Sequence, residues 1–156
     1  MTTPHKAFLR PLADERGIAV SERRETSAHD FTDLVRVSLV CGEQRTRIVG
    51  TTLGRLHRPH LLEAWGQRFN LQMDEGHLAL FRYQDVPGMV GRVGTAFGAH
   101  GVNISSAAVG RQPPGTGSDL AVMAITTDAP VPQPVVDEIV ASDGFVAGRA
   151  VPLGNY

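Results

Sequence analysis

The sequence predicts an α+β protein, and three observations support that prediction. Residues 77–153 alternate between stretches with the two-residue period of strands and stretches with the period of helices. Glycine and proline mark the points where one kind of stretch ends and the next begins. Hydrophobic residues make up 42% of the 156 residues, which is enough for a core. A chain of this length forms one ordinary domain or two small ones.

The second half predicts four strands and two helices in the order β-α-β-β-α-β. The first helix runs from Met89 to His100, where Val90, Val93 and Phe97 recur at helical spacing and Gly101 is suited to end the helix. The second helix falls within residues 131–142. The strands are expected at residues 77–85, 102–111, 119–128 and 145–153. This is the ferredoxin-like order, in which both helices cover one face of an antiparallel sheet.

The first half is less regular and predicts a small, incomplete domain or one that needs a partner. A short helix is expected within residues 4–17, and an extended segment follows over residues 18–24. Residues 33–53 predict two strands joined at residues 41–44. One further extended run is expected over residues 61–76, which ends in a polar turn. We therefore divide the chain into residues 1–76 and residues 77–156.

Composition excludes several classes of function. The net charge is −1 and there is no run of Lys or Arg, so nothing favours nucleic acid as a partner. A single cysteine, Cys41, supports neither a disulfide framework nor a zinc motif. No apolar run is long enough for a membrane span or a signal peptide. We expect a cytoplasmic protein without a membrane partner.

The sequence also lacks the motifs of a catalyst or a cofactor site. Gly88, Gly91 and Gly94 are spaced G-x-x-G-x-x-G, whereas dinucleotide binding requires G-x-G-x-x-G and a parallel sheet. Only His57 and His60 form a close histidine pair, and no cysteine or acidic pair joins them as metal ligands. No serine lies in a G-x-S-x-G motif. We expect no catalytic residues, no metal and no cofactor in this chain.

The turn after residue 85 predicts a binding site for a small zwitterion. Tyr83 and Asp85 are two residues apart on a strand and therefore share a face. Gly88 stands at the third position of a Pro-Gly type II turn, and the free amides near Met89 and Val90 suit a carboxylate. Asp85 suits an ammonium group. The alternative is that Asp85 caps the helix and Tyr83 is a half-buried strand residue.

Residues 77–153 resemble an ACT domain. The stretch "HLALFRYQDVPGMVGRVGTAFGAHGVNI" matches the first strand, D-x-P-G turn, helix and G-V-N-I strand of that family. The preceding segments "LADERGIAV", "RTRIVGTTLG" and "HLLEAWGQRFNLQMDEGH" are similar to the allosteric substrate-binding domain that precedes ACT in D-3-phosphoglycerate dehydrogenases. Together the halves resemble the C-terminal regulatory region of the long-form enzymes, with residues 1–76 as an incomplete substrate-binding domain.

This resemblance implies a non-catalytic regulatory module that binds L-serine, or a similar small amino acid, as a feedback effector of serine biosynthesis. The effector contacts of similar proteins fall on Tyr83, Asp85 and Asn103. Asn103 reaches the ligand from a neighbouring subunit, because ACT domains pair edge to edge, so self-association into a dimer or larger species is expected. NAD and hydride transfer would belong to other domains of an oxidoreductase parent, of which this chain is expected to be a fragment or a stand-alone remnant.

The resemblance also implies an anion site ahead of the ACT domain. Arg68 keeps a basic group there, and Arg58 and His60 lie close to the position of a family lysine that corresponds here to Leu61.

Two alternatives remain for the function as a whole. One is the equivalent module of an iron–sulfur L-serine dehydratase, although an iron–sulfur cluster needs several cysteines. The other is a dimerisation module without effector binding.

Overall fold

The computed structural model describes residues 11–23, 33–73, 76–112 and 119–154. The chain divides into two compact units, residues 1–30 and residues 31–156, which are described separately. In the first unit a short helix covers residues 11–15. Gly17 follows it with a φ of 66°, and the amide of Ile18 donates to the carbonyl of Ala13, which ends the helix in a Schellman motif. Residues 18–23 contain no strand, and the rest of the predicted first segments lies outside the described residues.

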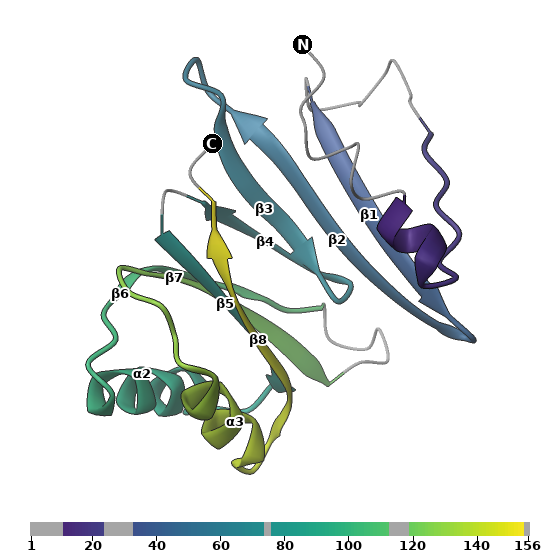
Figure 1. Ribbon diagram of the computed structural model, residues 1–156. Coiled ribbons are helices and arrows are strands. Elements are labelled where there is room, and N and C mark those ends of the chain that lie inside the picture. Colours follow the sequence, from purple (N-terminus) through teal and green to yellow (C-terminus); the bar gives the residue numbers. More distant parts are fainter. Residues whose placement is uncertain (1–10, 24–32, 74–75, 113–118, 155–156) are drawn as a thin grey trace. The chain divides into compact units, whose positions relative to one another are not determined.

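The described part of the second unit consists of two four-stranded antiparallel sheets and two helices (Figure 1). The first sheet has the order β1-β2-β3-β4, with β1 at Leu34–Cys41, β2 at Gln44–Leu53, β3 at Arg58–Ala64 and β4 at Gln67–Gln72. The second sheet has the order β6-β7-β5-β8, with β5 at Gly76–Gln84, β6 at Ile104–Gly110, β7 at Leu120–Thr127 and β8 at Phe145–Leu153. The helices are α2 at Met89–Ala99 and α3 at Gln133–Ala141.

The hairpin of β3 and β4 corrects one prediction. The sequence predicts a single extended run over residues 61–76, but the chain turns at Trp65 and Gly66, which have φ angles of 49° and 81°. Positive φ at both central residues is the geometry of a two-residue hairpin turn that Asn-Gly usually signals. Trp-Gly carries no such signal, because a bulky residue rarely adopts positive φ. The hairpin of β1 and β2, by contrast, is confirmed.

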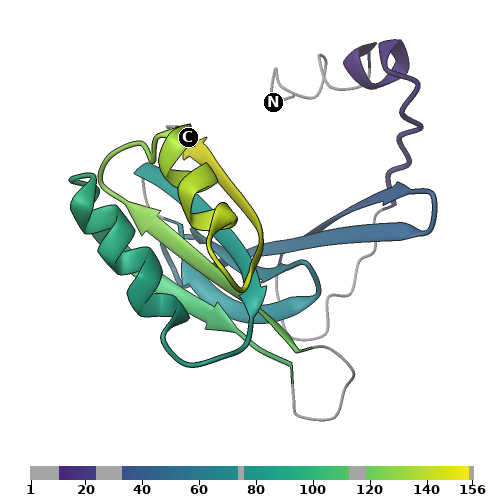
Figure 2. The same cartoon turned by 90° about the horizontal axis from the view of Figure 1, so that it is seen from below.

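The second sheet confirms the predicted ferredoxin-like order. Strand β7 lies between β5 and β6 and is antiparallel to both, while β8 pairs with the other edge of β5. Helices α2 and α3 lie side by side on one face of this sheet (Figure 2). Helix α2 ends where expected, since Gly101 has a φ of 69° and the amide of Val102 donates to the carbonyl of Phe97 at 2.9 Å.

The larger core lies between the second sheet and the helices. Alternate residues of β5 and β7 point into it and meet apolar side chains of α2 and α3; they are Ala79, Phe81 and Tyr83 of β5 and Ala121, Met123 and Ile125 of β7. The ring of Phe81 packs edge-on against Phe97 and Phe145, with centroid distances of 6.0 and 6.1 Å. Edge-to-face contact is the favoured geometry for aromatic rings, so these contacts also fix the position of β5 under the helices.

The opposite face of the second sheet packs against the first sheet. The buried cluster there combines residues of both sheets, namely Leu61, Ala64, Leu71, Leu78, Leu80, Val122 and Ala124. Buried Gln67 donates from Nε2 to the carbonyl of Leu120 at 3.0 Å, which joins β4 to β7. Strands β5 and β7 are therefore covered on both faces, which explains why they read as nearly continuous apolar runs. The domain boundary predicted after residue 76 falls next to the start of β5 and stays a prediction.

The tight packing of β6 on β4 at Gly110 predicts the effect of a single methyl group. A Cβ atom at Gly110 would lie 2.8 Å from Cδ1 of Phe69 and 2.9 Å from the carbonyl oxygen of Arg68. Because that oxygen belongs to the backbone of β4, the sheets would have to separate locally. We expect Gly110→Ala to lower the free energy of unfolding by about 1–3 kcal/mol, as other overpacked sites do. Urea denaturation followed by circular dichroism measures this change.

Gly98→Ala is the matched control, because a Cβ atom there would meet nothing within 4 Å. Alanine is the better helix former, so this variant should raise the free energy of unfolding by about 0.5–1 kcal/mol. A Gly110→Ala variant as stable as the wild type would contradict the close packing of β4 on β6.

Candidate functional site

The turn between β5 and α2 has the predicted geometry. Gly88 has φ 93° and ψ −11°, which are the angles of the third residue of a type II turn. The first amide of α2 with a helical acceptor is that of Arg92, which donates to the carbonyl of Gly88 at 3.1 Å. The amides of residues 89–91 have no partner inside the helix, and no side chain caps them. The N-terminus of α2 therefore presents free donors to an anion.

Asp85 lies between β5 and this turn and is joined to an arginine that the sequence analysis does not assign to the site. Its Oδ2 accepts a hydrogen bond from Nε of Arg111 at 2.7 Å. The side chains are 29% and 64% exposed, respectively, so solvent and small molecules can reach both. Since α2 has no side-chain cap, the alternative interpretation of Asp85 as the helix cap is wrong.

Tyr83 is more deeply buried than the half-buried position considered in the sequence analysis. It is 2% exposed, belongs to the core under the helices and lies 5.8 Å from Phe145 between ring centroids. Burial raises the pKa of Tyr83, the charge of Asp85 raises it further, and the charge of Arg111 opposes this rise. The charges of Asp85 and Arg111 thus lie near enough to Tyr83 to affect its pKa.

Asn103 lies at the opposite end of the sheet from Asp85. It directly precedes β6, and its carbonyl accepts from the amide of Asp128 at 3.3 Å. Ile104 pairs with Thr127, and Thr127 pairs with His77 near the start of β5. From His77 to the end of β5 the strand spans roughly 24 Å. One chain therefore does not bring Asn103 and Asp85 together.

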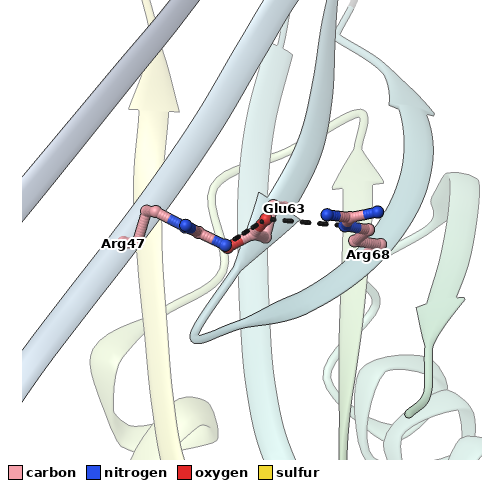
Figure 3. Close-up of polar contacts among 3 residues, drawn as sticks. All are labelled: Arg47, Glu63 and Arg68. Atoms are coloured by element: carbon pink, nitrogen blue, oxygen red, sulfur yellow. Dashed lines mark hydrogen bonds and ion pairs between the residues drawn. The ribbon is translucent and has the colours of Figure 1, made fainter. Parts of the chain in front are cut away.

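A second polar cluster lies on the first sheet, around Glu63 of β3 (Figure 3). The carboxylate accepts two hydrogen bonds from Arg47, at 2.5 Å from Nε and 2.9 Å from Nη2, and Nε of Arg68 lies 4.0 Å away. The hydrogen bond to Glu63 raises the pKa of Arg47. An open hollow of about 350 Å³ beside the cluster is lined by Leu34, Arg36, Arg47, Val49, Leu62, Glu63, Arg68 and Phe69.

The residues predicted as an anion site lie on the two strands of the β3–β4 hairpin, and the site itself stays a prediction. Arg58 and His60 lie on β3, where Nδ1 of His60 is 2.6 Å from Oδ1 of Asn70. Arg68 pairs with Glu63 in the strand register, further along the hairpin. The structure thus associates Arg68 with the Glu63 cluster rather than with His60.

Arg111, Arg47 and Glu63 are the residues that sequence reasoning missed. Arg111 could have been found from the sequence. In the predicted strand order, a single strand separates the strand at residues 102–111 from the strand that ends at Asp85. The contact of Arg47 with Glu63 depends on the register of β2 on β3, in which Val49 lies opposite Glu63. The sequence carries no local signal for that register.

The described ranges of the chain lack two other kinds of site. No group of three or more His, Cys, Asp or Glu side chains there could hold a metal ion. No helix in these ranges is long and apolar enough to cross a membrane.

Comparison with known proteins places this site in a family. Residues 77–143 match the ACT domain. The chain is 29% identical to D-3-phosphoglycerate dehydrogenase of Archaeoglobus fulgidus over 92% of its own length and 27% of that protein. It is 33% identical to the Methanocaldococcus jannaschii protein of the same name, over 82% of this chain and 23% of the relative. The Mycobacterium tuberculosis protein of the same name is 30% identical over 84% of this chain and 24% of the relative.

The chain thus spans about a quarter of the length of these relatives. The matched residues begin at the predicted start of the ACT domain and contain the turn, Asp85, Arg111 and Asn103. ACT domains generally bind amino acids and self-associate. Residues 77–143 belong to the ACT domain family, and the chain resembles the ACT-containing regulatory region of D-3-phosphoglycerate dehydrogenases.

Proposed function

We propose that this chain is a non-catalytic regulatory module that binds L-serine, or a similar small amino acid, at the turn between β5 and α2. It would transmit feedback inhibition to a D-3-phosphoglycerate dehydrogenase in serine biosynthesis. The observation that carries this proposal is the partly exposed carboxylate of Asp85 next to the uncapped N-terminus of α2, inside an ACT domain. The relatives named above favour a dehydrogenase over an iron–sulfur dehydratase as the parent enzyme.

The chemistry of the turn fits a zwitterion. The ligand ammonium binds Asp85, and the amides near Met89 and Val90 donate to the carboxylate. Each charge-assisted hydrogen bond contributes about 1.5–3 kcal/mol. After the entropy cost of binding, two or three such bonds leave an affinity on the order of micromolar to millimolar, which suits a metabolite sensor.

The position of Asn103 supports a site that two chains share. Strand β6 is an outer strand of its sheet, and the sequence between Asn103 and Arg111 has no charged side chain that would block pairing of its edge. If two copies pair antiparallel along β6, the start of one β6 lies beside the end of the other. Asn103 of the partner subunit then lies near the Arg111 and Asp85 end of the first chain. A two-fold dimer forms two such sites.

Calorimetric titration with L-serine tests the proposed function. The wild-type chain should bind with micromolar to millimolar affinity. Asp85→Asn keeps the shape of the side chain but removes the only anion of the turn, so it should abolish measurable binding. Asp33→Asn is the matched control, because Asp33 is also exposed but directly precedes β1 of the first sheet.

Glycine, L-alanine and L-cysteine in the same titration identify the effector if serine is not the preferred one. Serine binding that survives Asp85→Asn unchanged would place the site elsewhere. A wild-type chain that binds none of these amino acids would leave the dimerisation module as the better interpretation.

Mixing two inactive variants tests the shared site. Asp85→Asn and Asn103→Ala should each lose binding while remaining dimers by light scattering. In a mixed dimer one site carries both substitutions and the other carries neither. Random exchange of subunits should therefore restore about one quarter of the wild-type sites. If the mixture recovers no binding although mixed dimers form, Asp85 and Asn103 do not act across the interface.

A further inference from the structure

The ion pair of Asp85 and Arg111 joins two strands that are not neighbours. Arg111 directly follows β6, and β7 lies between β6 and β5. Arg111 uses only Nε for this bond, and among the described residues its two Nη groups make no other hydrogen bond. The Oδ1 atom of Asp85 likewise has no hydrogen-bond partner in those parts of the chain. Each member of the pair thus keeps unused polar atoms beside the other.

The exposure of the pair indicates that it is not there for stability. With side chains 29% and 64% exposed, water screens the attraction, and such a surface pair stabilises a fold by only about 0–1 kcal/mol. The fold is held by the buried clusters on the two faces of the second sheet. A role in recognition therefore accounts better for the placement of Arg111.

The charges of the pair match those of an α-amino acid. In a zwitterion the ammonium and the carboxylate are attached to the same carbon, so an anion and a cation that lie close together can bind both groups at once. Oδ2 of Asp85 and Nε of Arg111 are 2.7 Å apart. The planar guanidinium still offers the N–H donors of both Nη atoms, in the fork geometry that suits a carboxylate.

We propose that Arg111 is a specificity-determining residue of the effector site and binds the α-carboxylate of the amino acid through its Nη atoms. The ligand ammonium binds Oδ1 of Asp85, so that four charges of alternating sign form a closed and neutral set. This inference rests on the proposed function, because it adds Arg111 to the helix amides as a donor to the carboxylate at the same site.

In this assignment Arg111 supplies a selectivity that Asp85 and the helix amides do not. Asp85 alone attracts any small ammonium compound, whether or not it has a carboxylate. The amides of α2 donate hydrogen bonds to a neutral carboxamide oxygen as well as to a carboxylate, and the helix end carries only about half a positive charge. The full charge of Arg111 distinguishes an amino acid from its amide or from the corresponding amine.

The experiment compares L-serine with L-serinamide, which keeps the ammonium and the hydroxyl but replaces the carboxylate by a neutral group. Calorimetry of the full chain is run on the wild type, Arg111→Ala, Arg111→Lys and Arg55→Ala. Arg55→Ala is the matched control, since Arg55 is exposed in the turn between β2 and β3 of the first sheet. Circular dichroism and light scattering verify that each variant keeps its fold and its oligomeric state.

The wild type and Arg55→Ala should both prefer serine over serinamide by at least about tenfold. Arg111→Ala should bind serine about tenfold to a hundredfold more weakly, bind serinamide nearly as the wild type does, and so lose the preference. Arg111→Lys should retain part of the preference, because it keeps the charge without the fork. A merely structural role for Arg111 would weaken both ligands equally, and that result would overturn the proposal.

Three other results would also overturn the proposal. Tighter serine binding by Arg111→Ala would show that Arg111 competes with the ligand for Asp85. An unchanged preference in that variant would assign recognition of the carboxylate to the helix amides. Failure of the wild type to bind any amino acid would refute the proposed function and this inference with it. That failure is distinguishable from a failure of this inference alone, because it appears in the wild-type titration, whereas the role of Arg111 is tested in the Arg111 variants.

Discussion

Burial of β5 and β7 on both faces is the constraint on which the rest of the structure depends. One set of alternate side chains packs under α2 and α3, and the other set packs against the first sheet. A shift of register by one residue would exchange buried Phe81 for Arg82, so the register is strongly specified. Because β5 is held in this way, the position of its C-terminal end is also fixed. Asp85 and the Gly88 turn therefore extend from a rigid strand, which limits the entropy lost when a ligand binds there.

The fold was predictable from the sequence where its signals are local. Strand and helix periods and the glycine at residue 101 predict the elements of residues 77–153, and the structure confirms them. The turn at Trp65 was not predictable, because nothing in Trp-Gly announces positive φ at both residues. The packing of the first sheet on the second was not predictable either, since it joins residues that are distant in sequence, such as Gln67 and Leu120.

The candidate site, like the fold, was predictable only where its sequence signals are local. Asp85 and the turn at Gly88 follow from a short motif, and the structure has the expected turn geometry. Arg111 is 26 residues from Asp85 and joins the site only through the order of the strands. The deep burial of Tyr83 depends on how closely the helices cover the sheet, which no local pattern reports. Asn103 was predicted from the family resemblance alone. Its distance from Asp85 within one chain agrees with the proposal that it contributes across a dimer interface.

The arginine–carboxylate pair of Arg47 and Glu63 and that of Arg111 and Asp85 differ in a way that separates structure from recognition. The side chain of Glu63 is 6% exposed and accepts both donors of the Arg47 fork. A ligand that drew Arg47 away would leave a buried carboxylate without its partner, which is strongly unfavourable. Asp85 is open to solvent and holds Arg111 by one bond, so each can take a further partner without exposing a buried charge. Exchange of partners is therefore energetically feasible at Asp85 and costly at Glu63, which is the physical reason for locating the effector site at the first rather than the second.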